Sequence, residues 1–343
     1  MTNSSSNPQS RPHITGLGNA LCDLEFKGSK IILKELNLEP GDTLLASQNE
    51  QQNRRKTLEE AFGTPHLCSG GSVANSLVVA ACAPVDCTLV SMVGADSEGS
   101  NYRNDLGQAG VELVTSTEAV AQTGNCLAVI TGDGQRTMST YLGCNEEISP
   151  QLTQTPDARS TIANSDWLIL EGYLLANKDS MSAMEDAQKW ALQHQTKIAL
   201  TLSSALIAKN EYKSLERLLE NGVDLVIGNE SEACAACDCE DPQTALALLT
   251  KFSPQVAITL SERGALLATS NKVWHYQTEP VVAIDSLGAG DAFAGGLLTA
   301  LALGHSLEEA AKWGCAAGAT CVQNWGARLS EGEKSKLLTQ WGI

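Results

Sequence analysis

The stretch that decides the fold reads Asp285-Ser-Leu-Gly-Ala-Gly-Asp-Ala-Phe-Ala-Gly-Gly296. An apolar extended run, Val281 to Ile284, leads into it, and a helix of small residues follows with Phe293, Leu297 and Leu301 at four-residue spacing. Gly288-Ala289-Gly290 therefore lies at the N-terminus of that helix. Free N–H groups and the positive end of the helix dipole attract an anion there, and the glycines let a phosphate approach the backbone. The stretch predicts a phosphate site where an extended segment turns into a helix.

Asp291 lies one residue inside that helix. A carboxylate at this place would repel a resting phosphate, but it suits a base that takes the proton from an attacking hydroxyl. The alternative is that Asp291 caps the helix and that the glycines only make a tight turn. The functional interpretation predicts phosphoryl transfer, with Gly288, Ala289 and Gly290 as a backbone anion hole.

The composition is that of a globular protein without a nucleic-acid or membrane partner. The chain has 343 residues, of which 43% are hydrophobic and 18% charged, and its net charge is −17. So acidic a chain offers no basic field to nucleic acid or to an anionic membrane, and no run of eighteen apolar residues occurs. The polar segment Met1 to Pro12 has no apolar signal core, so we expect a disordered tail at residues 1–12 and a cytoplasmic protein.

The cysteines indicate reduced thiols. Their count of eleven is odd, and examples such as Cys87 and Cys321 lie in apolar elements, which is typical of buried free thiols and not of a disulfide framework. Cys234, Cys237 and Cys239 form a cluster that could offer three thiolates to a soft metal, but no fourth ligand is visible nearby.

Most of the chain alternates between extended apolar runs and amphipathic helices, which predicts a parallel sheet covered by helices on both faces. The alternation is seen in Thr88–Val93 with a helix to about Gln108, Trp167–Leu170 with Ser180–His194, Lys197–Leu202 with Ala205–Glu220, Asp224–Ile227 with a helix from Glu230, and Gln255–Leu260, which opens a pair of strands.

Two segments break this rhythm. Leu21 to Phe26 alternates with period two, and Asn125–Thr131 and Arg136–Leu142 form a hairpin around Gly132-Asp-Gly-Gln135. No helix intervenes, so we expect a small sheet with one open face, which covers a site or pairs with a partner.

Four motifs in order resemble the PfkB carbohydrate-kinase family, which is ribokinase-like and includes ribokinase and adenosine kinase. The similar segments are Asp285 to Asp291 for the second family signature, Gly70 to Asn75 for the first, Asn229-Glu-Ser-Glu232 for the Asn-x-x-Glu motif, and Gly18 to Asp23 for the first substrate-binding strand. The resemblance implies a ribokinase-like three-layer α/β/α fold with a mostly parallel central sheet and a small β-sheet lid. It assigns residues 13–20, 53–122 and 144–343 to a large α/β nucleotide-binding domain, and residues 21–52 and 123–143 to the lid.

The period of two places Asn19, Leu21 and Asp23 on one face of a strand. A carboxylate and an amide on one face can grip a vicinal diol, although a polar strand edge is the plain alternative. By resemblance, Asp23 is the ligand of the ribose hydroxyls, Asn19 is its neighbour in the substrate site, and Leu21 forms an apolar wall.

Two further groups are assigned to the substrate side by resemblance. Gly70, Gly71 and Asn75 would face the sugar hydroxyls, where a cap of the helix beginning at Val73 is the alternative. Arg136, just beyond the hairpin turn, could neutralise charge on the transferring phosphoryl group, whereas an exposed arginine on a hairpin is usually only solvated.

Asn229 and Glu232 follow a strand at the carboxyl end of the predicted sheet and share one helix face. They could hold the waters of Mg²⁺ or orient phosphate, and they would equally form a capping box. By resemblance they bind Mg²⁺ through water. The other expected nucleotide contacts are Thr259, Gly264, Asp285 and Ala317, although helix packing explains Ala317 equally well. The implied cofactors are ATP and Mg²⁺, with room for a monovalent cation.

Subfamily-level matches favour a nucleoside substrate. The segments Thr123 to Cys126, Ile130 to Asp133 and Leu200 to Ser203 are most similar to adenosine kinase. We expect transfer of the γ-phosphoryl group of ATP to a hydroxymethyl hydroxyl of a nucleoside, adenosine to AMP, with Leu21, Leu127 and Val129 around the base. A PfkB-type sugar kinase and a non-catalytic nucleotide- or sugar-binding protein are the alternatives.

Two rival classes are excluded by their missing motifs. Gly16-Leu-Gly18 begins like a dinucleotide fingerprint, but Leu21 stands where the third glycine belongs. A Gly-x4-Gly-Lys-Ser/Thr loop occurs nowhere. The expected partner is a small-molecule nucleoside or sugar, and the expected assembly is a monomer or a homodimer through the lid.

Overall fold

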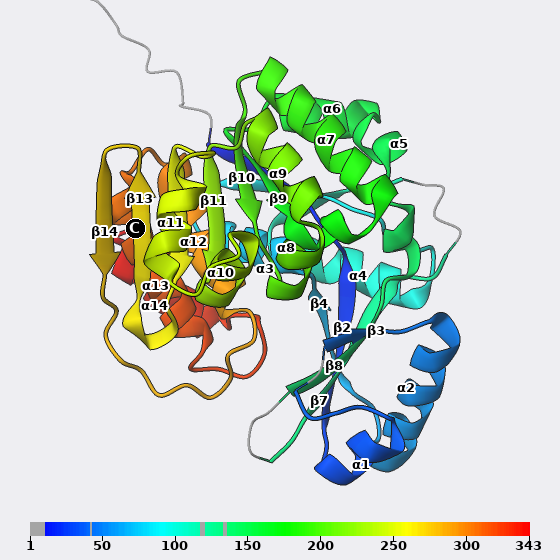
Figure 1. Cartoon of the computed structure of the whole chain (residues 1–343). Coiled ribbons are helices and arrows are strands. Elements are labelled where there is room, and N and C mark those ends of the chain that lie inside the picture. Colours follow the sequence, from blue (N-terminus) through cyan, green and yellow to red (C-terminus); the bar gives the residue numbers. More distant parts are fainter. Residues whose placement is uncertain (1–10, 42, 117–120, 133–135) are drawn as a thin grey trace, which may run out of the picture.

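The computed structural model describes residues 11–41, 43–116, 121–132 and 136–343. Most of the tail predicted to be disordered, and the tip of the predicted hairpin, lie outside the described residues. Two sheets organise the rest of the chain, a large one and a small one (Figure 1).

The large sheet has nine strands in the order β14-β13-β12-β11-β10-β9-β1-β5-β6. All neighbours from β12 to β6 pair in parallel, and β13 and β14 are antiparallel at one edge. The strands are β1 (His13–Leu17), β5 (Asp86–Val90), β6 (Val111–Val114), β9 (Trp167–Glu171), β10 (Lys197–Thr201), β11 (Leu225–Asn229), β12 (Gln255–Thr259), β13 (Ala265–Thr269) and β14 (Lys272–Tyr276).

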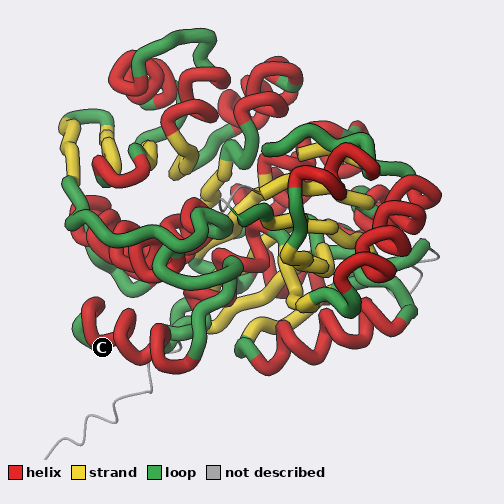
Figure 2. Tube along the Cα trace, turned by 90° about the horizontal axis from the view of Figure 1, so that it is seen from below, coloured by secondary structure: helices red, strands yellow, loops and turns green. Residues whose placement is uncertain are grey.

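Helices bury both faces of this sheet, so two separate apolar cores lie against it. One core is covered by α3 (Ser72–Ala80), α4 (Ser97–Gln108), α12 (Ala289–Ala302), α13 (Leu307–Cys321) and α14 (Glu331–Trp341). The other is covered by α5 (Pro150–Thr153), α6 (Pro156–Ala163), α7 (Lys178–Gln193), α8 (Ala205–Asn210), α9 (Tyr212–Asn221), α10 (Glu230–Ala236) and α11 (Pro242–Leu249). Figure 2 shows the strands between helices on both sides. The predicted three-layer fold is confirmed.

The structure differs from the predicted elements of the large domain in two places. The helix predicted over residues 205–220 is divided at Glu211 into α8 and α9. The apolar run Val281–Ile284 belongs to neither sheet, since Val282 is 84% exposed and the Ile284 N–H donates to the carbonyl of Val322 at 2.7 Å. The run is therefore a surface segment that leads into α12.

The small sheet has the order β3-β8-β7-β2-β4 and lies apart from the large one (Figure 1). Its strands are β2 (Leu21–Lys27), β3 (Thr43–Leu45), β4 (His66–Gly70), β7 (Gly124–Ile130) and β8 (Arg136–Tyr141). We call this sheet, with α1 (Lys30–Glu35) and α2 (Gln48–Phe62), the lid. It extends past the predicted boundary at residue 52, because β4 pairs antiparallel with β2.

One face of the lid is covered by helices that the sequence did not reveal. Leu24 and Phe26 of β2 and Leu127 and Val129 of β7 pack with residues of α1 and α2 in a third core, which also contains Ile32, Leu33, Leu36, Leu38 and Leu58. Because side chains alternate along a strand, Asp23 and Glu25 face the other way. The prediction that Leu127 and Val129 surround a base is therefore wrong, and Cys126 and Ala128, paired with Asp23 and Glu25, lie on the open face.

The chain passes between the two sheets at points where the backbone is tightly constrained. Gly71 links β4 to α3 with φ +102°, and a Cβ there would lie 2.1 Å from the carbonyl oxygen of Asn19. Asn145 holds the segment between β1 and β2, because its Oδ1 accepts from the Ala20 N–H and its Nδ2 donates to the Ala20 carbonyl, both at 2.8 Å. All eleven cysteines are free. Among the described residues, no helix is both long and apolar enough to cross a membrane.

Candidate active site

The loop predicted to form an anion hole lies at the start of α12. Gly288 is the N-cap residue in the left-handed conformation, with φ +74°, and a Cβ there would lie 2.5 Å from the Cβ of Ala327. A Cβ on Gly290 would meet no atom within 4 Å, so the space before this first turn is open. The first N–H groups of a helix have no intrahelical acceptor. The loop therefore offers backbone donors to an anion.

Asp291 is held by α3 rather than by its own helix. The Ser72 hydroxyl donates to Oδ1 at 2.7 Å and the Asn75 amide donates to Oδ2 at 2.9 Å. α12 comes this close to α3 because Gly295 has no side chain: a Cβ there would lie 2.4 Å from the Ser76 carbonyl. Burial raises the pKa of Asp291, and the two hydrogen bonds oppose that effect. The carboxylate is thus oriented beside the anion hole and is available as a base.

The substrate side has a second buried carboxylate, Glu171, which the sequence reasoning missed. The Asn19 amide donates to its Oε1 at 2.6 Å and the Val73 N–H donates to its Oε2 at 3.2 Å. Burial raises the pKa of Glu171 to about 7. The available signal was its position at the carboxyl end of an apolar strand, where α/β folds bind ligands.

Asp23 lies on the open face of the lid beside Gly70. A Cβ on Gly70 would lie 2.2 Å from an Asp23 carboxylate oxygen, so the glycine makes room for this side chain. Burial, followed by the nearby Glu25 charge, raises the pKa of Asp23 to about 7, and Arg328 opposes the shift. The Asn75 Oδ1 is buried and has no hydrogen-bond partner among the described residues. It is available to a ligand hydroxyl.

Two more side chains close to these carboxylates were not predicted. Arg328 donates from Nη2 to the Ser69 carbonyl at 2.6 Å, and its charge opposes the burial that raises the pKa values of both Asp23 and Asp291. Tyr173, in the 3₁₀ turn Gly172–Ala176, is 39% exposed, and the charges of Asp291 and Glu171 add to the burial that raises its pKa. Neither residue lies in a local motif, so only the fold brings them to the site.

On the nucleotide side, Asn229 and Glu232 form the capping box. The Asn229 N–H donates to the Glu232 Oε2 and the Glu232 N–H donates to the Asn229 Oδ1, both at 2.9 Å. Burial raises the pKa of Glu232, and the charge of Asp291 adds to that effect, so the two carboxylates lie in one acidic region. A cation between them would relieve this repulsion. The pair therefore fits the outer shell of a magnesium ion.

The other predicted nucleotide contacts lie in different surroundings. Thr259 pairs with Asn229 at the carboxyl end of the sheet. Gly264 has φ +88°, and a Cβ there would lie 2.0 Å from the Tyr276 carbonyl, so strand packing explains this glycine. Ala317 is fully buried against α12, which corrects its assignment as a nucleotide contact, and Ala316 and Gly318 are the partly exposed neighbours.

Asp285 and Arg136, which are predicted to contact the nucleotide and the phosphoryl group, form an ion pair with each other. Asp285 accepts from the Leu287 N–H at 3.0 Å and from the Gly326 N–H at 2.8 Å, and the Arg136 guanidinium forms an ion pair with it. Among the described residues, no group of three or more His, Cys, Asp or Glu side chains could hold a metal ion, and this includes Cys234, Cys237 and Cys239.

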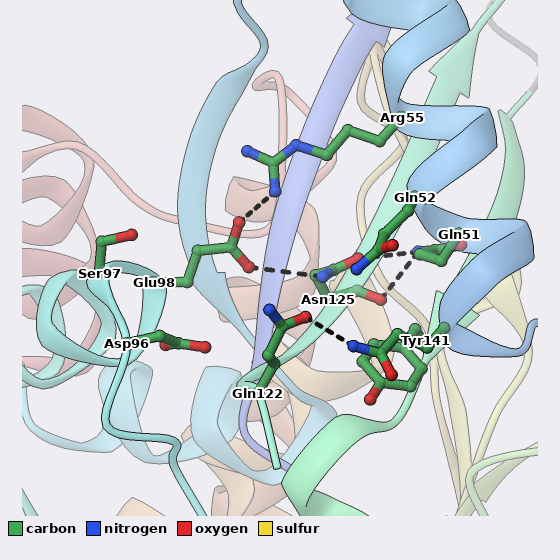
Figure 3. A pocket seen from close by; sticks show the side chains of 10 residues that line it. Gln51, Gln52, Arg55, Asp96, Ser97, Glu98, Gln122, Asn125 and Tyr141 are labelled. Carbon is green, nitrogen blue, oxygen red and sulfur yellow. Dashed lines mark hydrogen bonds and ion pairs between the residues drawn. The ribbon is translucent and has the colours of Figure 1, made fainter.

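A separate pocket of ≈ 190 Å³ lies on the helix-covered side of the lid (Figure 3). It is lined by polar residues of α2, α4 and the strands β7 and β8: Gln48, Gln51, Gln52, Arg55, Asp96, Ser97, Glu98, Gln122, Asn125 and Tyr141. Its side chains largely pair with one another, as in the Arg55–Glu98 ion pair and the 3.2 Å hydrogen bond from Gln48 to Gln122. None of the predicted site residues lines it.

Fold and site indicate the class of protein: a three-layer α/β/α domain with a small second sheet, and a helix N-terminus beside the buried Asp291, are expected of a phosphotransferase with an alcohol acceptor. Residues 42–334 match the family described as pfkB family carbohydrate kinase. The chain belongs to this family, whose kinases use ATP and usually Mg²⁺.

Three relatives illustrate the range of the family. The ribokinase of Haemophilus influenzae is 29% identical over 79% of this chain and 87% of its own length. A probable sugar kinase of Rhizobium etli has a TM-score of 0.87 at 26% identity, over 97% of this chain and 99% of its own. The adenosine kinase of Sinorhizobium meliloti has a TM-score of 0.85 at 26% identity, over 96% of this chain and 99% of its own.

Proposed function

We propose that this kinase phosphorylates the hydroxymethyl hydroxyl of a nucleoside, adenosine to AMP. The single observation that carries the choice of a nucleoside is the exposed ring of Tyr173 beside Asp291 and Glu171. A flat aromatic surface next to these two carboxylates suits a base attached to ribose, because base stacking on an aromatic ring contributes about 1–3 kcal/mol. The likeness to the S. meliloti adenosine kinase supports the same choice.

The reaction follows from the groups in the cleft. Asp23, Asn19 and Asn75 bind the ribose hydroxyls and direct the hydroxymethyl group toward Asp291. The hydroxyl oxygen forms a bond to the γ-phosphorus of ATP as its proton passes to Asp291, and the bond to the β,γ-bridging oxygen breaks to release ADP. The N–H groups of residues 288–290 bind the charged phosphoryl oxygens.

Asn229 and Glu232 would hold magnesium through its waters, and the bound ion would supply neutralising charge to the phosphate chain. We include a monovalent cation as a further cofactor in the proposal. Turnover in potassium chloride compared with choline chloride at equal ionic strength tests that part.

A sugar kinase is the second candidate, and Glu171 favours it. A buried carboxylate that already accepts from Asn19 could accept from an additional hydroxyl of a free sugar at the place where a nucleoside has its base. The ribokinase relative supports this alternative.

A substrate panel with purified protein and ATP separates the two candidates. We expect kcat/KM for adenosine to exceed that for ribose by about 10² or more, because binding of the purine must come from stacking and apolar burial. Tyr173→Leu should lower kcat/KM for adenosine by about tenfold or more and leave that for ribose nearly unchanged. More efficient turnover of ribose or fructose than of adenosine would refute the nucleoside assignment.

Assembly and location complete the proposal. We propose a monomer or a homodimer through the lid, whose edge strands are β3 and β4, and sedimentation at several protein concentrations distinguishes them. We propose the cytoplasm as the compartment, which the eleven free cysteines support. Fractionation of cells that express the protein tests the location.

A further inference from the structure

The guanidinium of Arg136 lies between two buried carboxylates from different parts of the chain. Its Nη1 is 3.3 Å from Oε1 of Glu25, and its Nη2 contacts Oδ2 of Asp285. The side chains of Arg136, Glu25 and Asp285 are only 9%, 3% and 4% exposed. The Trp325 ring covers the guanidinium at 5.9 Å from its centroid. This cluster is therefore a largely desolvated ion-pair network and not a surface salt bridge.

The network joins the lid to the large domain. Arg136 begins β8 and Glu25 lies on β2, so both belong to the lid. Asp285 lies just before α12 and belongs to the large domain. Glu25 is the partner of the arginine within the lid, and Asp285 is its partner in the large domain.

Asp285 in turn shapes the anion loop. It accepts from the Leu287 N–H at 3.0 Å and from the Gly326 N–H at 2.8 Å. One carboxylate therefore binds both the residue before Gly288 and the separate segment that packs against Gly288. The residue after Gly326 is Ala327, which packs directly against Gly288. Movement of Asp285 would therefore move the backbone that presents the N–H groups of residues 288–290.

We propose that Arg136 is a positioning residue, which couples closure of the lid to the shape of the anion loop through Asp285 and does not contact the transferred phosphoryl group. A direct contact would require the guanidinium to leave Glu25 and Asp285, and both buried carboxylates would lose their compensating charge. In the position observed, Arg136 also neutralises a carboxylate close to the place where a polyphosphate must bind. The inference rests on the proposed use of residues 288–290 as the anion hole.

A double-mutant cycle tests the role of Arg136. kcat/KM for ATP is measured for the wild type, Arg136→Gln, Asp285→Asn and the double variant, with the best acceptor of the substrate panel. If Arg136 acts through Asp285, its removal should cost tenfold or more in the wild type and no more than about threefold in the Asp285→Asn background. Equal factors in the two backgrounds would overturn the coupling of Arg136 through Asp285.

Amide hydrogen exchange without any ligand gives a second, independent readout. Arg136→Gln should accelerate exchange in the peptides that contain Leu287 and Gly326, because their N–H groups are bonded to Asp285. Arg136→Lys, which keeps a charge but not the planar fork, should restore part of the protection. Arg217→Gln, which removes an exposed ion pair with Glu185, is the matched control and should change neither peptide.

The outcomes are distinguishable from failure of the proposed function. The exchange experiment uses the ligand-free enzyme, so its result does not depend on whether adenosine is the substrate. Unchanged exchange at Leu287 and Gly326 in a folded Arg136→Gln protein would overturn the coupling through Asp285. If Arg136→Gln does not fold, Arg136→Lys in the same cycle carries the test, with the same expected dependence on Asp285.

Discussion

Replacing Asp291 by Asn is the sharpest test of the catalytic assignment. The change removes the base but keeps the size of the side chain, so turnover should fall by about 10²–10⁴-fold. The fold should tolerate the change. An asparagine can accept one of the two present hydrogen bonds, from Ser72 at 2.7 Å or from Asn75 at 2.9 Å, and the lost bond costs about 1 kcal/mol.

Removal of a buried charge offsets part of that loss, because burial already raises the pKa of Asp291. We therefore expect the Tm of Asp291→Asn to lie within about 3 °C of the wild type. ATP affinity should be nearly unchanged or slightly higher, since a negative charge next to the anion hole is gone.

The assay combines ADP release, ATP binding by calorimetry and thermal unfolding on the same preparations. Ser72→Ala is the matched control, because it removes a hydrogen bond to the carboxylate and keeps the base, and its turnover should fall by no more than about tenfold. If Asp291→Asn is folded, binds ATP and keeps turnover within tenfold of the wild type, the base lies elsewhere and the reasoning is refuted.

Three further predictions follow from glycine geometry, buried acids and the lid. Gly288→Ala should destabilise the protein by about 1–3 kcal/mol, because φ is +74° and the added Cβ would meet Ala327. Gly290→Ala, with open space around it, should keep the Tm of the wild type and raise the KM for ATP. Equal Tm values for the two variants would contradict this expectation. Burial raises the pKa of Glu171 to about 7 from its ordinary value of 4.5, so this group stabilises the folded state at low pH and that contribution is lost as pH rises from about 4.5 to 7. The Tm of Glu171→Gln minus the Tm of the wild type should therefore increase from pH 5 to pH 8. A constant difference between the two Tm values would contradict this expectation. Saturating acceptor substrate should slow amide exchange in β7 and β8, measured against α7 as an internal control, and unchanged protection would argue against closure of the lid.

The parts of the site that could be predicted are those whose residues lie close together in the sequence. Gly288 to Asp291 could be placed at a helix N-terminus because the spacing of apolar residues defines that helix. Glu171, Tyr173 and Arg328 could not, because each is an ordinary residue until strand order and helix packing bring it to the cleft. Sheet order is a long-range property that no local pattern contains.

The error over the lid has a definite physical origin. Period two showed that Leu127 and Val129 share one face of a strand, but not which face is covered. The covering helix α2 contains many polar residues and buries Leu58 and Gln51, so its amphipathic pattern is weak. Because α1 and α2 were not predicted, the apolar face that they cover was interpreted as the face that contacts the substrate.

The strand order of the two sheets also constrains how a nascent chain can fold. β1 pairs with β5 on one side and with β9 on the other, and β2 pairs with β7, whose residues begin at Gly124. During synthesis, one edge of β1 remains bare until Trp167–Glu171 has left the ribosome, and the lid stays incomplete until β7 and β8 have followed. Exposed strand edges invite pairing with other chains. A nascent chain of this protein therefore exposes strand edges to other chains until the residues of β9, β7 and β8 have been synthesised.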